Sequence, residues 1–327
     1  MAIVLYALTA LLYCALAYHG WATRHAGLAA TTAGGPVGGP AGGPILGGQP
    51  GSMVLVPGPA PGGSAEGQPA WWHLLMVAVL ASHGMLLHET IFPADRMVFG
   101  FAFALSAMLW LGVGIYWIES FFFSLAGLGL VVIPVAMLAS LMPLAFPGAQ
   151  ILGYAARPLF KLHFIIANVA YGLFTLAAFH AFLMLLVERR LHGFNRGHGV
   201  HVPGGAMAAG APQQAGWLGR WLDLLPPLLT LEKLLFRLIA AGFVLLTLTI
   251  ASGLLFSEEL FGRVFRFDHK TVFALVSWVM FAGILAGRRF YGWRGRVALR
   301  WVIASFCILL LAYVGSRFVI EVILHRL

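Results

Sequence analysis

Long apolar stretches alternate with short polar or glycine-rich stretches along most of the chain. A helix rises about 1.5 Å per residue, so about 20 mainly apolar residues are needed to cross roughly 30 Å of membrane hydrocarbon. Eight stretches approach or reach this length, and they run from Ala2 to Trp21, Trp71 to His88, Met97 to Ile118, Phe121 to Met142, Leu162 to Val187, Leu234 to Phe256, Thr271 to Gly287 and Val297 to Ile320. This pattern predicts an all-α integral membrane protein, a bundle of about eight transmembrane helices.

The same pattern divides the chain into three parts. Residues 1–23 form the first predicted transmembrane helix, which lacks the basic start and the small-residue cleavage site of a signal peptide. Residues 24–70 are rich in glycine and proline and cannot bury a core, so we expect a disordered linker. Residues 71–327 hold the other seven helices, with a flexible cytoplasmic loop expected at 188–233.

Composition supports a membrane location and excludes soluble classes of protein. The sequence is 61% hydrophobic and 9% charged, whereas a soluble domain has about 25% charged residues. Soluble enzymes and nucleic-acid-binding proteins are therefore excluded. The two cysteines, Cys14 and Cys307, lie in apolar stretches without a C-x-x-C pair, so thiol exchange is not expected.

The distribution of basic residues predicts the orientation in the membrane. Ten lysine and arginine residues lie in the loops that follow the odd-numbered helices, and seven lie on the other side. Dense groups at Arg189–Arg190 and between Arg288 and Arg296 stand directly at helix ends, where basic residues favour the cytoplasmic side most strongly. We therefore expect both termini outside, with lipid rather than nucleic acid around the basic loops.

Several histidines gather at the predicted outer side. His88, His163, His269 and His325 lie at helix ends there, and His83 lies five residues before His88, roughly 8 Å deeper in the membrane. A buried histidine in a membrane is costly unless it is paired or ligates something. Haem suits this group better than zinc, because the surroundings are apolar and aromatic rather than rich in Cys, Asp and Glu.

Two other interpretations of the histidines stay open. Histidine at a membrane boundary can be simply an interfacial polar residue, and the chain would then be a scaffold or regulator without haem. A respiratory cytochrome b subunit would instead need haem ligands at two depths, which would involve His19, His73 and His180 on the inner side.

Particular residues resemble a known family. They are Phe267-Asp268-His269-Lys270, Ala274-Leu275 with Trp278, Gly292-Trp293-Arg294-Gly295, Tyr313 with Gly315, His83-Gly84, and His163 with Tyr171. In these residues and motifs the chain resembles the cytochrome c assembly family of CcsA-like and HemX-like haem-handling membrane proteins, and most closely the YpjD-like inner membrane group. The resemblance covers roughly the second to the eighth helix.

The resemblance implies a site and a function. In the family, two external histidines hold haem beside a tryptophan-rich loop, which would give His163 and His325 as axial ligands. His83 would be a deeper ligand, and Asp268, His269 and Lys270 would contact the haem edge. The segment from Ser257 to Lys270 lacks tryptophan, and Ala286 stands where haem-synthetase members carry a histidine.

These departures favour an accessory, HemX-like role over full haem-synthetase activity. The expectation is a bacterial inner-membrane protein, more a carrier than an enzyme, that binds or shuttles haem b during c-type cytochrome assembly. The iron would be held by His163, His325 or His83, and the partners would be haem and other cytochrome c maturation proteins.

Overall fold

A computed structural model describes residues 2–33, 68–92, 98–147, 150–151, 158–197, 226–261 and 269–324. Within these residues, eight helices are long and apolar enough to cross a membrane, which confirms the predicted helical membrane bundle. The helices are α1 (Ala2–Ala33), α2 (Ala70–Ile91), α3 (Phe101–Ser120), α4 (Ala126–Ala145), α5 (Pro158–Gly197), α7 (Leu228–Phe261), α8 (His269–Tyr291) and α9 (Gly295–Leu310).

Short elements complete this description. The last helix continues beyond α9 through η1 (Leu311–Gly315), α10 (Ser316–Phe318) and η2 (Val319–Ile323). The strands β1 (Val98–Phe99) and β2 (Gln150–Ile151) pair in antiparallel fashion, with Val98 opposite Ile151. This small ladder ties the segment before α3 to the segment before α5.

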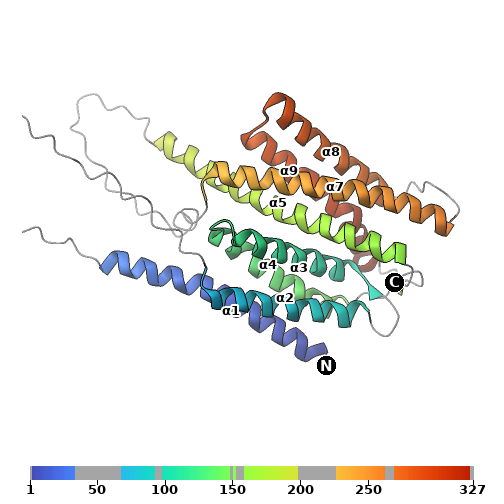
Figure 1. Cartoon of the computed structure of the whole chain (residues 1–327), viewed down its shortest axis with the longest axis horizontal. Helices are drawn as coiled ribbons and strands as arrows, with labels where there is room; N and C mark the ends of the chain where they lie inside the picture. The colour runs from blue at the N-terminus through green and yellow to red at the C-terminus, as the bar shows by residue number, and fades with distance from the viewer. Residues whose placement is uncertain are drawn as a thin grey trace, which may run out of the picture.

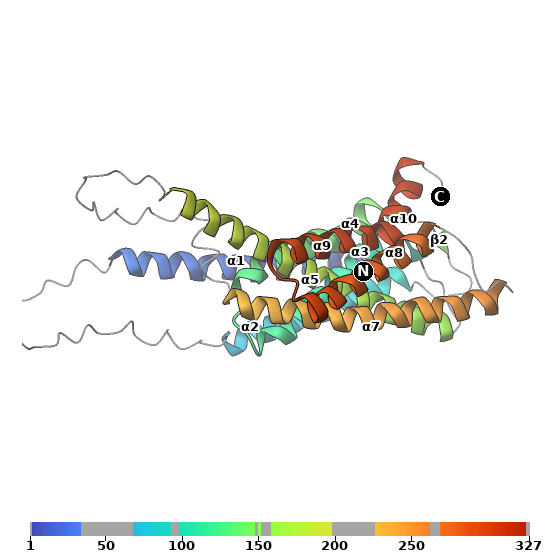
Figure 2. The ribbon, with the colours of Figure 1, turned by 90° about the horizontal axis from the view of Figure 1, so that it is seen from above.

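The helices form two groups that meet at α3 and α5 (Figure 1). Helices α1 to α4 pack against one another on one side, and α5, α7, α8 and α9 pack together on the other. Figure 2, seen from above, shows α7 running along α5. The shared core is formed almost entirely by apolar side chains, including Phe174, Phe281 and Val132.

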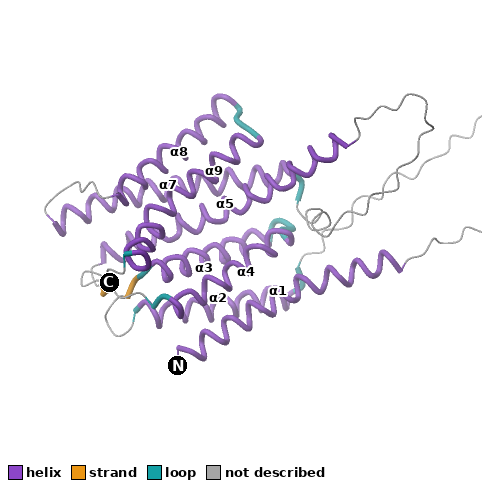
Figure 3. Tube along the Cα trace, turned by 180° about the vertical axis from the view of Figure 1, so that it is seen from behind, coloured by secondary structure: helices purple, strands orange, loops and turns teal. Residues whose placement is uncertain are grey.

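The first helix starts and the last helix finishes at the same end of the bundle (Figure 3), as an even number of crossings requires. We call this the terminal end. It also holds the end of α2 and the starts of α3, α5 and α8, whereas the α3–α4 and α8–α9 turns lie at the opposite end. The terminal end therefore collects the segments in which most of the predicted site residues lie.

Several helices extend beyond the apolar stretches that predicted them. Helix α1 continues to Ala33, α5 continues to Gly197, and α7 starts at Leu228. Hydropathy detects only the part of a helix that crosses lipid, whereas residues such as Glu188 and Arg189 favour helix without being apolar. Residues 34–67 of the predicted linker and 198–225 of the predicted loop lie outside the described residues.

Glycine allows α3 and α5 to pack at close range. A Cβ on Gly172 of α5 would lie 2.9 Å from the Leu111 Cβ and 3.4 Å from the Gly112 nitrogen, both in α3. Carbon atoms in favourable contact are about 3.5–4.0 Å apart, so only glycine fits at this crossing. Small residues are the usual means by which membrane helices approach this closely.

Replacing Gly172 with valine should destabilise the bundle by about 1–3 kcal/mol, because the added carbons push α3 and α5 apart. A lower midpoint of thermal unfolding in detergent would show this. Gly283→Val in α8 is the matched control, since no atom lies within 4 Å of a Cβ there. Equal midpoints for Gly172→Val and the native protein would contradict the close packing.

Candidate functional site

A cavity of about 170 Å³ lies at the terminal end between α3, α5, the start of α8 and the last helix. Most of its wall is apolar or aromatic, with a histidine, an asparagine, two tyrosines and two cations among the polar groups. The lining residues are Ala104, Met108, Phe160, His163, Phe164, Ala167, Asn168, Tyr171, Lys270, Tyr313, Val314 and Arg317. We call it the His163 cavity.

The imidazole of His163 is held in place by α7. Its Nδ1 lies 2.9 Å from Ser252 Oγ, and that hydroxyl donates to the Thr249 carbonyl at 3.1 Å. We assign the ring proton of His163 to Nδ1, because the single hydroxyl hydrogen of Ser252 is directed to the Thr249 carbonyl and the Ser252 oxygen is then placed to accept from Nδ1–H. Nε2 then carries the lone pair, which is the arrangement found when a histidine ligates a metal and donates its other N–H to a supporting group.

Glycine at position 253 makes this arrangement possible. A Cβ on Gly253 would lie 3.3 Å from His163 Cε1, closer than carbon atoms usually approach. A side chain at position 253 would therefore push the imidazole by a few tenths of an ångström, and glycine there lets α7 bring Ser252 against the ring without that shift.

The last helix and the start of α8 supply the charged part of the wall. Tyr313 lies in the π-helical turn η1, and Arg317 follows it in α10. Such π turns are frequent at functional sites because they change which side chains face a neighbouring helix. The Lys270 ammonium lies 5.6 Å from the centre of the Tyr313 ring, and the Tyr171 hydroxyl donates to the Leu309 carbonyl at 3.0 Å.

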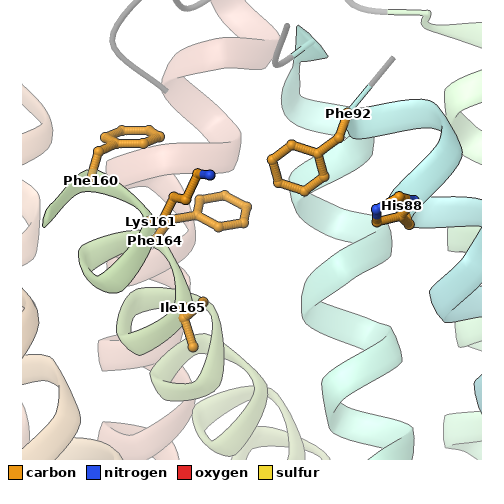
Figure 4. Close-up of a pocket in the computed structure, with 6 residues that line it drawn as sticks. All are labelled: His88, Phe92, Phe160, Lys161, Phe164 and Ile165. Carbon is orange, nitrogen blue, oxygen red and sulfur yellow. The ribbon is translucent and has the colours of Figure 1, made fainter. Parts of the chain in front are cut away.

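A second and larger cavity, of about 340 Å³, lies at the same end between α2 and α5. Figure 4 shows its α5 residues on one side, and His88 with Phe92 on the other. The α5 residues are Phe160, Lys161, Phe164 and Ile165. Phe160 and Phe164 also line the His163 cavity, so these two residues belong to the walls of both. We call this larger space the α2–α5 cavity.

His83 lines neither of these cavities. Its side chain is fully buried, with Nδ1 2.9 Å from the Tyr13 hydroxyl and Nε2 2.9 Å from Ser106 Oγ. Both ring nitrogens therefore have protein partners, one on α1 and one on α3. In this structure His83 connects three helices by hydrogen bonds.

The histidines His19, His73 and His180, which lie toward the opposite end of the bundle, also have close protein neighbours. His73 Nδ1 accepts a hydrogen bond of 3.2 Å from Trp117 Nε1, and His180 Nε2 lies 3.7 Å from Glu119 Oε2. Neither these two histidines nor His19 lines either cavity described above. No shared ligand site for them is seen in the part of the chain that the structure describes.

The structure brings two of the predicted site residues, His163 and Lys270, to one cavity. His269 begins α8 and is exposed, while Asp268 and His325 lie outside the described residues. Sequence reasoning missed Asn168, Ser252 and Arg317. Arg317 gave a usable signal, because a cation inside an apolar stretch commonly marks a site. Ser252 gave none, because serine in a helix usually bonds its own backbone.

Comparisons with known proteins give a consistent result. A family model described as Cytochrome C assembly protein matches residues 71–324. The chain is 39% identical over 99 residues to the inner membrane protein YpjD of Escherichia coli strain K12, which covers 30% of this chain and 37% of that relative. It is 25% identical over 217 residues to the cytochrome c biogenesis protein CcsA of Microcystis aeruginosa, covering 57% of this chain and 66% of the relative.

A third relative, from Azospirillum brasilense, is an uncharacterized 28.8 kDa protein that is 29% identical over 178 residues. That match covers 54% of this chain and 58% of the relative. The chain thus matches between about a third and two thirds of the length of these relatives. No solved structure matches the chain.

Proposed function

We propose that this chain, which belongs to the cytochrome C assembly protein family, binds haem b in the His163 cavity during the assembly of c-type cytochromes. It acts in the bacterial inner membrane as an accessory haem carrier. One observation carries the proposal: a histidine whose Nδ1 lies 2.9 Å from Ser252 Oγ lines a mainly apolar cavity whose wall also includes two cations.

The residues of the cavity suit haem in chemical type. Haem iron takes an imidazole nitrogen as axial ligand, and the tautomer of His163 leaves Nε2 as that nitrogen. Phe160 and Phe164 offer aromatic surface to a flat macrocycle, and Lys270 and Arg317 offer cations to its carboxylates. A zinc or calcium ion at this cavity would require further Cys, Asp or Glu ligands.

The volume of the His163 cavity means that its wall must move before haem can enter. The His163 cavity has about 170 Å³, whereas small-molecule sites usually have about 300–1,000 Å³. Phe160 and Phe164 separate it from the larger α2–α5 cavity, so rotation of these two rings would enlarge it. We therefore expect the two phenylalanine rings to move outward when the cavity is filled.

The remaining predicted residues keep supporting roles in this proposal. His325 is the candidate for the second axial position, and Asp268, His269 and Lys270 would contact the propionate edge. When bound, haem supplies the iron–porphyrin unit that is passed on to a c-type apocytochrome. His163 holds the iron, the aromatic wall excludes water, and the terminal end of the bundle faces the outside.

Replacing Ser252 with alanine should weaken haem binding by about 10–100-fold, the usual effect of losing the group that orients a ligating histidine. A haem titration of the purified protein, followed by absorption, measures the change. Ser277→Ala in α8 is the matched control, because Ser277 also donates to a carbonyl of its own helix, at 2.8 Å from Phe273, and lines neither cavity. Equal affinities for Ser252→Ala and the native protein would contradict the assigned tautomer.

A further inference from the structure

The α2–α5 cavity is lined by none of the residues proposed to hold the iron or the propionates, although it is the larger of the two spaces. Its walls are almost entirely apolar and combine one imidazole, from His88, with one ammonium group, from Lys161. His88 is exposed: its ring centre lies 6.1 Å from that of Phe92, and its Nδ1 lies 4.0 Å from Oε1 of the neighbouring Glu89, whose side chain is also exposed. Such an exposed pair adds little stability and can exchange partners.

The position of the cavity is the second observation. It lies between helices that face lipid, since Ile165 is 59% exposed and Phe92 is 39% exposed on its walls. The two cavities have only Phe160 and Phe164 in common among their lining residues. A ligand in the α2–α5 cavity would therefore be in contact with both the bilayer and the His163 wall.

We propose that the α2–α5 cavity is a lateral portal through which haem passes between the bilayer and the His163 cavity. This inference rests on the proposed function. Haem is flat, apolar on its faces and anionic at one edge, which matches an apolar space with His88 and Lys161 at the terminal end. Phe160 and Phe164 form the gate, because rotation of their rings joins the two cavities.

A portal should affect the rate of haem uptake, whereas a ligand of the iron should affect the final haem occupancy. Ile165 lines the portal but not the His163 cavity, so Ile165→Trp should obstruct passage and leave the final occupancy unchanged. Uptake of haem from phosphatidylcholine vesicles should slow by about tenfold, which corresponds to a barrier raised by roughly 1.4 kcal/mol. The rate is read as the growth of the haem absorption band after mixing vesicles with the full chain in detergent.

Leu162→Trp is the matched control. Leu162 lies on the same helix, is 53% exposed against 59% for Ile165, and lines neither cavity. It should take up haem at the native rate. His88→Ala should also slow uptake, since it removes the imidazole of the portal while leaving His163 in place.

The outcomes separate the portal from the proposed function. If Ile165→Trp takes up haem at the native rate, or if Leu162→Trp slows it equally, the portal is wrong while the function stands. If Ile165→Trp lowers the final occupancy, the two cavities form one site and the portal is also wrong. If the native protein takes up no haem, the proposed function itself fails.

Discussion

Replacing His163 with glycine should abolish haem binding by the purified protein, and added imidazole should restore part of it. The haem affinity should fall by more than the factor of about 10–100 expected when only a supporting residue is removed, because the nitrogen that binds the iron is itself lost. Imidazole can enter the space left by the side chain and supply the same nitrogen. The absorption spectrum of the haem-loaded protein, with and without imidazole, measures both effects.

His19→Gly is the control for this experiment. His19 lies on α1 and packs edge-on against Trp71, 4.2 Å between ring centres, so it stands apart from the His163 cavity. It should bind haem as the native protein does. Retention of native affinity in His163→Gly, or a loss that imidazole cannot reverse in a folded protein, would show that His163 is not the ligand.

Replacing His83 with alanine should have its main effect on stability. The substitution removes a fully buried side chain and leaves the Tyr13 and Ser106 hydroxyls without their partner. Each buried polar group left unsatisfied costs about 1–3 kcal/mol, so the free energy of unfolding should fall by about 2 kcal/mol or more. Unfolding of the detergent-purified protein by heat or denaturant measures this fall.

The same variant should bind haem normally in its folded fraction. His83→Gln offers a conservative comparison, because an amide has both a donor and an acceptor and can keep part of the hydrogen-bond network. It should recover part of the lost stability. A His83→Ala protein that is as stable as the native one but binds no haem would instead assign the iron to His83.

Much of the fold could be predicted from the sequence, because membrane hydrocarbon imposes a simple length rule. The stretch from Phe121 to Met142 predicted α4, and the stretch from Thr271 to Gly287 predicted α8, with each end within five residues of the observed one. Hydropathy could not give the extension of α5 to Gly197, because that part is polar. It also could not give the π turns near Tyr313, which depend on packing in the last helix.

The candidate site was predictable only in part. Sequence position placed His163 and Lys270 at the same membrane side, and the structure places both on one cavity. Sequence alone could not separate His83 from His163, because the difference is in the partners that fold around each ring. Tyr13 and Ser106 lie within hydrogen-bond distance of the two nitrogens of His83, which lines neither cavity, whereas His163 lies against Ser252 and lines the His163 cavity.

Titration of the purified full chain with haem in detergent tests whether this chain holds haem at His163. Binding at His163 should give an absorption band that differs from that of haem in detergent alone and that saturates as haem is added. The band should be absent in His163→Gly and present in His19→Gly. If the absorption of the native protein during the titration only follows that of haem in detergent without protein, the chain does not hold haem at His163.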